Sequence, residues 1–189
     1  MAHALGLAAL LLLCTCVDGR TPSNTISVPN GGPWGDWEFM DMCPAKQYAR
    51  GFSLKIEPRR GSADDTSVNG IRLICPGPGS ETLQFVESAV GRWGNWSSVL
   101  WCSEGIIQSF ALRVEVSQGD GDDTAVNNIK FFCSDGAILE IKGGKWGSYG
   151  ESSDSCKKGI CGMQTRVQKP QGTGDDTALN DVRFSCCTD

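Results

Sequence analysis

The chain has 189 residues with 22 acidic and 17 basic side chains, so its formal net charge is −5. Lys and Arg are scattered singly or in pairs, which argues against nucleic acid or an anionic membrane as the partner, since both attract clustered cations. The chain contains one histidine, His3, and ten cysteines.

The first 19 residues have the layout of a cleaved signal peptide. An apolar run from Leu5 to Leu13 is too short to span a bilayer, and small or weakly polar residues follow it as far as Gly19. We predict cleavage after Gly19, with cleavage after Cys16 as the alternative, and a single exported domain over residues 20–189. That domain contains no histidine and eight of the cysteines.

Three copies of one unit of roughly 55 residues make up the exported chain, over about 20–78, 79–135 and 136–189. Each copy begins with a predicted apolar strand, at 25–28, 83–87 and 137–141. A motif of the form W-G-x-aromatic follows as Trp34-Gly35-Asp36-Trp37, Trp93-Gly94-Asn95-Trp96 and Trp146-Gly147-Ser148-Tyr149. We place the motif in the second strand and expect its tryptophans to pack in the core.

The third and fourth predicted strands alternate with period two, as half-buried strands do. The inward positions of the third are Phe52, Leu54 and Ile56, then Phe110, Leu112 and Val114, then Met163, Thr165 and Val167. A loop of the form D-D-T-x-x-N separates the two strands, with the pairs Asp64 and Asp65, Asp122 and Asp123, and Asp175 and Asp176. The inward positions of the fourth are Ile71, Leu73 and Cys75, then Ile129, Phe131 and Cys133, then Val182, Phe184 and Cys186.

This pattern predicts an all-β fold of twelve strands. One amphipathic sheet cannot bury its own apolar face, so three four-stranded sheets should pack those faces around a shared axis. The result is a triangular prism with pseudo-threefold symmetry. A three-bladed propeller is the nearest alternative, although propellers usually have four or more blades.

The eight cysteines predict four disulfides, because an even number in an exported chain is typical of a disulfide framework. Repeat spacing pairs Cys43 with Cys75 and Cys102 with Cys133. In copy three the same spacing pairs Cys156 with Cys186 and Cys161 with Cys187. The inward–outward alternation of the strand (strand parity) disagrees with this pairing, because Cys161 shares the inward phase of Met163. The pairing of these four cysteines therefore stays open. A zinc site is the rival interpretation, which the lack of histidine disfavours.

Without histidine, Ser-His-Asp and Cys-His catalysis are excluded, and carboxylate chemistry is what remains. The six loop aspartates are the candidate acidic groups. They are identical in three copies, whereas an active site needs two carboxylates in different environments, so we favour a structural role. We predict no catalytic residue, no metal and no cofactor.

Two further residues are candidates for carbohydrate chemistry. Trp101 lies outside the repeated motif, next to Cys102, and is the candidate aromatic contact for a sugar, with core packing as the alternative. Asn95 begins the sequon Asn95-Trp96-Ser97 and is a candidate for N-glycosylation, although its place inside the tryptophan motif can bury it.

In combination, the W-G-x-W motif, the G-D-D-T-A-x-N loop and the terminal Cys186-Cys187 resemble the vitelline membrane outer layer protein 1 family over essentially the whole exported chain. Tyr149 and Ser67 depart from that pattern. The resemblance implies a β-prism (type I) of three Greek-key sheets. It also implies a secreted structural or binding component of an egg coat or mucosal secretion, with extracellular-matrix or egg-coat glycoproteins or glycans as partners. Two alternatives accompany it: carboxylate-based glycosyl transfer on N-acetylglucosamine oligosaccharides, and a lectin-like carbohydrate-binding module.

Overall fold

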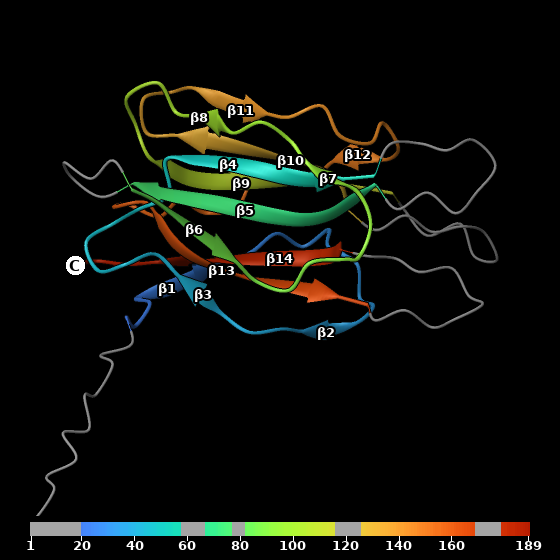
Figure 1. Cartoon of the computed structure of the whole chain (residues 1–189), viewed down its shortest axis with the longest axis horizontal. Helices are drawn as coiled ribbons and strands as arrows, with labels where there is room; N and C mark the ends of the chain where they lie inside the picture. The colour runs from blue at the N-terminus through green and yellow to red at the C-terminus, as the bar shows by residue number, and fades with distance from the viewer. Residues whose placement is uncertain (1–19, 58–66, 77–81, 116–125, 169–178) are drawn as a thin grey trace, which may run out of the picture.

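The computed structural model describes residues 20–57, 67–76, 82–115, 126–168 and 179–189. They form three antiparallel sheets whose long strands run along one common axis (Figure 1). The predicted leader and the six loop aspartates lie outside the described residues. In the described part of the chain, no helix has the length and apolar character needed to cross a membrane.

Sheets B and C are built from consecutive segments of the chain. Sheet B has the order β6 (Leu83–Glu87), β5 (Val68–Pro76), β4 (Gly51–Ile56), β7 (Asn95–Trp96), and β8 (Leu100–Trp101) also pairs with β4. Sheet C has the order β11 (Ile138–Glu140), β10 (Val126–Cys133), β9 (Ile107–Val114), β12 (Ser148–Tyr149). In both, the strand that follows three consecutive strands returns beside the first of them, which is the Greek-key order.

Sheet A joins the two ends of the described chain. Its order is β1 (Asn24–Ile26), β14 (Leu179–Cys186), β13 (Ile160–Val167), β2 (Asp36–Trp37), and β3 (Asp41–Met42) also pairs with β13. Each sheet therefore combines the third and fourth strands of one sequence copy with the first and second strands of the next. Repeat boundaries and sheet boundaries do not coincide.

The predicted inward positions meet in one core between the sheets. Most are fully or nearly fully buried, while Ile56 and Val114 are partly buried against the cluster. Four phenylalanine rings form the centre, and edge-to-face pairs such as Phe52–Phe131 and Phe110–Phe184 have centroids 4.7 Å apart. Because these rings come from all three sheets, the core confirms the predicted β-prism.

Three disulfides connect the sheets in a ring. Cys43–Cys75 joins sheet A to sheet B, Cys102–Cys133 joins sheet B to sheet C, and Cys156–Cys186 joins sheet C to sheet A. The fourth, Cys161–Cys187, lies within sheet A. The structure thus has the pairing that repeat spacing gives.

The parity argument for Cys161 was wrong because β13 contains an irregularity at that position. Ile160 pairs with Cys186 and Gly162 with Ser185, which leaves Cys161 as the extra residue of the strand. An extra residue breaks the two-residue alternation, so the phase of Cys161 does not follow from that of Met163.

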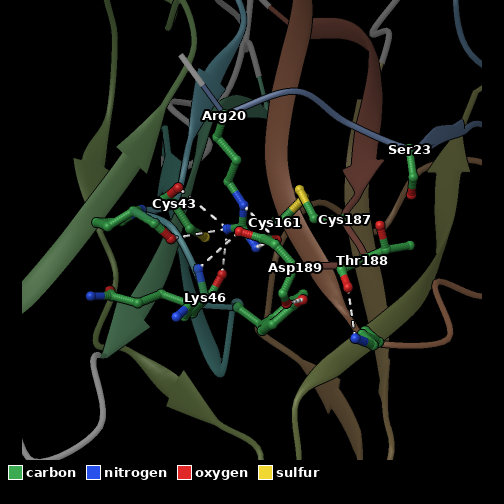
Figure 2. Close-up of polar contacts among 12 residues, drawn as sticks. Arg20, Ser23, Cys43, Lys46, Cys161, Cys187, Thr188 and Asp189 are labelled. Atoms are coloured by element: carbon green, nitrogen blue, oxygen red, sulfur yellow. Dashed lines mark hydrogen bonds and ion pairs between the residues drawn. A yellow bond between two sulfur atoms is a disulfide. The ribbon is translucent and has the colours of Figure 1, made fainter. Parts of the chain in front are cut away.

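A cluster of polar contacts holds the segment at Arg20 to Asp189 at the opposite end of the described chain (Figure 2). The Arg20 guanidinium donates to Asp189 Oδ1 at 2.5 and 3.1 Å and to the carbonyl oxygen of Gln47 at 2.6 Å. The Tyr48 hydroxyl donates to the Asp189 carbonyl oxygen at 2.6 Å. The Arg20 side chain is only 7% exposed, so this cluster fixes the segment that leads into β1.

Candidate functional site

The outer face of sheet B carries an indole that covers a glycine of the neighbouring strand. Trp101 in β8 is the register partner of Gly51 in β4. A Cβ atom on Gly51 would lie 2.7 Å from Trp101 Cε3 and 2.9 Å from Cδ2, so only glycine allows the ring to rest there. With one side of the ring against the strand, Trp101 is still 40% exposed.

The residues in register with Gly51 on the neighbouring strands form one row across the sheet and continue the apolar surface. Gly51 pairs with Ile74, and Ile74 pairs with Phe85. Ile74 has an outward phase and is nonetheless fully buried, whereas Phe85 is 50% exposed. Residues directly opposite each other on neighbouring strands contact one another, so Phe85 and Trp101 flank Ile74 and extend the surface on both sides.

An ion pair with no net charge borders this row. The Arg72 guanidinium forms an ion pair with Glu87 on the neighbouring strand. Its Cζ lies 4.0 Å from the ring centroid of Trp96 and 5.0 Å from that of Phe85. Stacking and pairing together hold Arg72 in place, and the pair adds no net charge to the surface. We call Trp101, Gly51, Phe85, Arg72 and Glu87 the sheet B platform.

Sheet C repeats the ion pair, as Lys130 with Glu140, but among the described residues neither of the other sheets has an indole over a glycine at this place. In sheet A, Met42 covers Gly162 at the position that Trp101 and Gly51 occupy in sheet B. In sheet C the strand position is Ser109, and Ser155 precedes Cys156 where Trp101 precedes Cys102. Within the described residues, the indole over a glycine is therefore specific to sheet B.

An indole held in this way can bind a sugar ring. The C–H groups on one side of a pyranose are apolar and weakly positive, and they complement the negative face of an aromatic ring. Polar groups beside the ring supply hydrogen bonds that fix the orientation of a ligand. The platform has both parts, an indole that is 40% exposed and the Arg72–Glu87 pair one row away.

The tryptophans of the repeated motif are not in the core, which corrects the expectation from the sequence. Trp34, Trp93 and Trp146 are 55%, 47% and 51% exposed. The second aromatic of each motif is half-buried on the outer face of its sheet, under a cation from the fourth strand. These pairs are Trp37 with Arg183, Trp96 with Arg72, and Tyr149 with Lys130, with the cation 4.4, 4.0 and 3.9 Å from the ring centroid.

The asparagine of the D-D-T-x-x-N loop has a structural position in every sheet. Asn69, Asn127 and Asn180 are each skipped in the strand register, which makes each the extra residue of a β-bulge. All three are fully buried, and their carbonyl oxygens accept backbone hydrogen bonds of 2.5–2.8 Å from Gly91, Gly144 and Gly32. Period-two patterning contains no signal for these bulges, although the threefold recurrence of the asparagine does mark them.

The remaining predicted residues are placed as follows. The Asn95 side chain in β7 is exposed, so folding does not bury the sequon; the Ser97 hydroxyl accepts a hydrogen bond from the Leu54 amide at 3.1 Å. Ser67, one of the departures from the family pattern, donates from its hydroxyl to the Asn127 carbonyl oxygen at 3.1 Å and links copies one and two. Among the described residues, no group of three His, Cys, Asp or Glu side chains is placed to hold a metal ion.

Comparison with known sequences gives one family and two close relatives. The family model described as vitelline membrane outer layer protein I (VOMI) matches residues 24–189. The vitelline membrane outer layer protein 1 homolog of Mus musculus is 52% identical over 168 residues, which cover 87% of this chain and 84% of the mouse protein. The Homo sapiens homolog is 51% identical over 178 residues, covering 92% of this chain and 88% of the human protein.

Comparison with solved structures gives plant lectins. Calsepa lectin, solved in complex with a bisected glycan, has a TM-score of 0.55 at 12% identity; the match covers 89% of this chain and all (100%) of the lectin. Artocarpin, solved in complex with mannopentose, has a TM-score of 0.54 at 15% identity, with 88% and 98% of the two chains covered. At such low identity these similarities establish a shared β-prism fold and nothing further.

Proposed function

This chain belongs to the vitelline membrane outer layer protein I family, and from this premise we propose that it is a secreted component of an extracellular layer that binds the glycans of that layer. The observation that carries the proposal is the partly exposed indole of Trp101 over Gly51 on the sheet B platform. Four disulfides support the extracellular location, because such bonds form and persist in oxidising compartments.

The position of the platform supports binding over a purely structural role. Structural features of this protein recur in all three sheets, as the buried asparagines and the cation–aromatic pairs do. Trp101 has no equivalent tryptophan in sheets A and C as the structure describes them, and Gly51 leaves room for its ring. A large aromatic side chain that is 40% exposed stabilises the fold less than a buried one does. A ligand can bury the apolar surface that Trp101 still exposes, and this burial favours binding.

The chemistry of the platform favours a neutral sugar. Its cation, Arg72, is already paired with Glu87 and stacked between two rings. A sulfated or carboxylated sugar would have to displace Glu87, whereas the hydroxyl and acetamido groups of a neutral sugar can hydrogen-bond to the pair as it stands.

The test is retention of the protein on immobilised coat or mucin glycans. We expect Trp101→Ala to lower the affinity about 5- to 10-fold, the effect of losing one ring-stacking contact of about 1–1.5 kcal/mol. Met42→Ala is the matched control, since it truncates the side chain that covers the corresponding glycine in sheet A. Equal retention of wild type and Trp101→Ala would refute the platform as the binding site.

The same preparation separates binding from glycosyl transfer. The protein is incubated with chito-oligosaccharides, and the products are analysed by mass spectrometry. A binding protein leaves the length distribution unchanged. Longer products that disappear in a folded variant with Asp→Asn changes in all three acidic loops would instead favour the transferase.

A further inference from the structure

Copy two contains the only N-glycosylation sequon of the chain, Asn95-Trp96-Ser97. Copies one and three have Asp36 and Ser148 at the position of Asn95, and neither has Ser or Thr at the position of Ser97. The sequon is therefore a difference between the copies, as Trp101 is, and not part of the repeat that builds the fold. Both differences lie on sheet B.

The sequon asparagine is accessible in the folded protein. Asn95 is exposed in the edge strand β7, opposite Ile56 at the end of β4. The Ser97 hydroxyl lies against the same strand, since it accepts a hydrogen bond from the Leu54 amide at 3.1 Å. A glycan on Asn95 is therefore compatible with the native sheet and would extend into solvent.

Attachment of a glycan to Asn95 needs only the donor that the secretory pathway supplies. An oligosaccharide is transferred from a lipid diphosphate carrier to Asn95 Nδ2. The bond between the sugar C1 and a diphosphate oxygen breaks, a C1–Nδ2 bond forms, and one amide proton is lost to the released diphosphate. Each copy then carries one branched oligosaccharide, whose core consists of neutral N-acetylglucosamine and mannose units.

Asn95 and Trp101 lie at opposite ends of one strand, because β7 and β8 both pair with β4 (Figure 1). Asn95 is the register partner of Ile56, the last residue of β4. Trp101 is the register partner of Gly51, the first residue of β4. The two partner positions are five residues apart, which corresponds to about 17 Å along a strand.

The side chains of the sequon and of the platform also point to opposite sides of the sheet. Trp96 is on the outer face, where the Cζ atom of Arg72 lies 4.0 Å from its ring centroid. Successive residues of a strand point to opposite faces, so Asn95 has the phase of Ile56 and points away from the face that carries Trp101. A glycan on Asn95 therefore leaves the sheet away from the platform of its own chain, which favours a contact with another copy.

We infer that the sheet B platform of one copy binds the N-glycan on Asn95 of a second copy, and that the protein assembles with itself through this contact. The inference rests on the proposed glycan binding and names its partner. The ion pair between Arg72 and Glu87 leaves the platform without net charge, which suits the neutral core sugars of an N-glycan.

The contact joins two different surfaces, the glycan of one copy and the platform of the next. Such a heterologous contact leaves a free platform at one end of the assembly and a free glycan at the other, so the assembly grows unless a ring closes. Each contact is weak alone, but many contacts along a layer raise the overall affinity. A protein of this kind would form part of the layer whose glycans it binds.

The test uses the protein as secreted by cells that attach only neutral, mannose-terminated N-glycans. In analytical ultracentrifugation, the weight-average mass of the wild type should rise about twofold or more once the concentration exceeds the dissociation constant. Asn95→Gln, which carries no glycan, and Trp101→Ala, which lacks the indole, should each stay monomeric. Mixed together, the two variants should form pairs, because one supplies the platform and the other the glycan.

Two controls separate the effect of the glycan from that of the side chains. Ser97→Thr keeps the sequon and a hydroxyl group beside the Leu54 amide, so it should associate as the wild type does. Enzymatic removal of the glycan from the folded wild type should return it to the monomer mass, a result that does not depend on the folding of any variant. Mass spectrometry of the peptide that contains Asn95 detects the glycan, and near-ultraviolet circular dichroism checks each fold.

The outcomes separate this inference from the proposed function. Absence of a glycan on Asn95 of the secreted wild type overturns the inference. If the two variants do not pair while Asn95→Gln is retained on immobilised coat glycans, the inference is wrong and the proposed function stands. If the variants pair but no form is retained on coat glycans, the inference holds and the coat glycan is the wrong ligand.

Binding of the glycan to the platform of its own chain is a further outcome that the same measurements detect. The wild type would then be monomeric, and removal of its glycan would increase its retention on coat glycans. That result also overturns the inference.

Discussion

Asp181 is a carboxyl group at a position where the three sheets differ. It lies in β14, and its Oδ1 accepts a hydrogen bond from the Val182 amide at 2.8 Å. Burial raises its pKa from 3.8 to about 6, although that hydrogen bond and the charges of Arg166 and Arg183 act in the opposite direction. In sheet C the corresponding residue is Asn128, whose Oδ1 accepts from the next amide at 2.9 Å and whose Nδ2 donates to the Ile141 carbonyl oxygen at 2.9 Å.

We therefore predict that Asp181→Asn stabilises the protein in a pH-dependent way. The folded-state pKa is raised, so the carboxyl group favours folding below pH 4, and this contribution is lost as the pH rises through about 6. The variant should gain about 1–3 kcal/mol in the free energy of unfolding at pH 8 relative to its difference from wild type at pH 4. Urea unfolding of both proteins at the two pH values measures this gain, and an equal difference at both would contradict the prediction.

At the scale of the strand and its neighbouring loop, sheets A and B differ in which side of one contact carries the larger residue. In sheet B, Val90 packs on Gly70, and a Cβ on that glycine would lie 2.6 Å from Val90 Cγ1. In sheet A the arrangement is reversed: Gly31 lies against Asp181, and a Cβ on Gly31 would overlap the carboxyl group. Each sheet thus has room for one side chain at this place.

This complementarity predicts that two substitutions compensate each other. Gly31→Val alone should destabilise the protein by about 1–3 kcal/mol through overpacking. The pair Gly31→Val with Asp181→Gly reproduces the arrangement of sheet B, and we expect it to recover most of that loss. A double-mutant cycle by chemical denaturation gives the coupling energy between positions 31 and 181. Additive effects of the two substitutions would argue against direct packing.

At the scale of the whole molecule, three disulfides each link one sheet to the next. Sheets B and C are joined by Cys102–Cys133, whose cysteines are 31 residues apart. Cys161–Cys187 closes a similar separation of 26 residues but lies within sheet A. The chain-entropy model gives both bonds nearly the same stabilisation, since it depends on loop length alone.

We predict that Cys102→Ala with Cys133→Ala lowers the free energy of unfolding by about 3–4 kcal/mol. Cys161→Ala with Cys187→Ala, the matched control, should cost about the same. Guanidinium unfolding of the oxidised proteins measures both. A cross-sheet loss much larger than the loss within sheet A would show that the bond also maintains native packing between sheets B and C.

Much of the fold follows from the sequence because its signals are local. Alternation assigns the inward phase of residues such as Phe52 and Phe184 within one strand, and a repeat of rare residues aligns the copies without knowledge of contacts. The same repetition gives the disulfide pairs of copies one and two. Parity failed at Cys161, where one extra residue changes the phase and no residue type marks the change.

The candidate site was only partly accessible in this way. Trp101 stood out as the tryptophan beyond the repeated motif, but its use as a platform depends on Gly51, 50 positions earlier in the chain. The exposed Trp34, Trp93 and Trp146 likewise precede glycine turns that lie directly against distant strands. These are contacts between residues far apart in the sequence, and residue types and local spacing do not predict such contacts.

By itself, then, the sequence determined the three copies, the strand phases and the all-β prism, because alternation and repetition are properties of short segments. Only the tertiary structure decided which halves of the copies share a sheet, that the disulfides join neighbouring sheets, and which indoles face solvent. Those features arise when segments from the two ends of the described chain pair in sheet A and the three apolar faces close on one core.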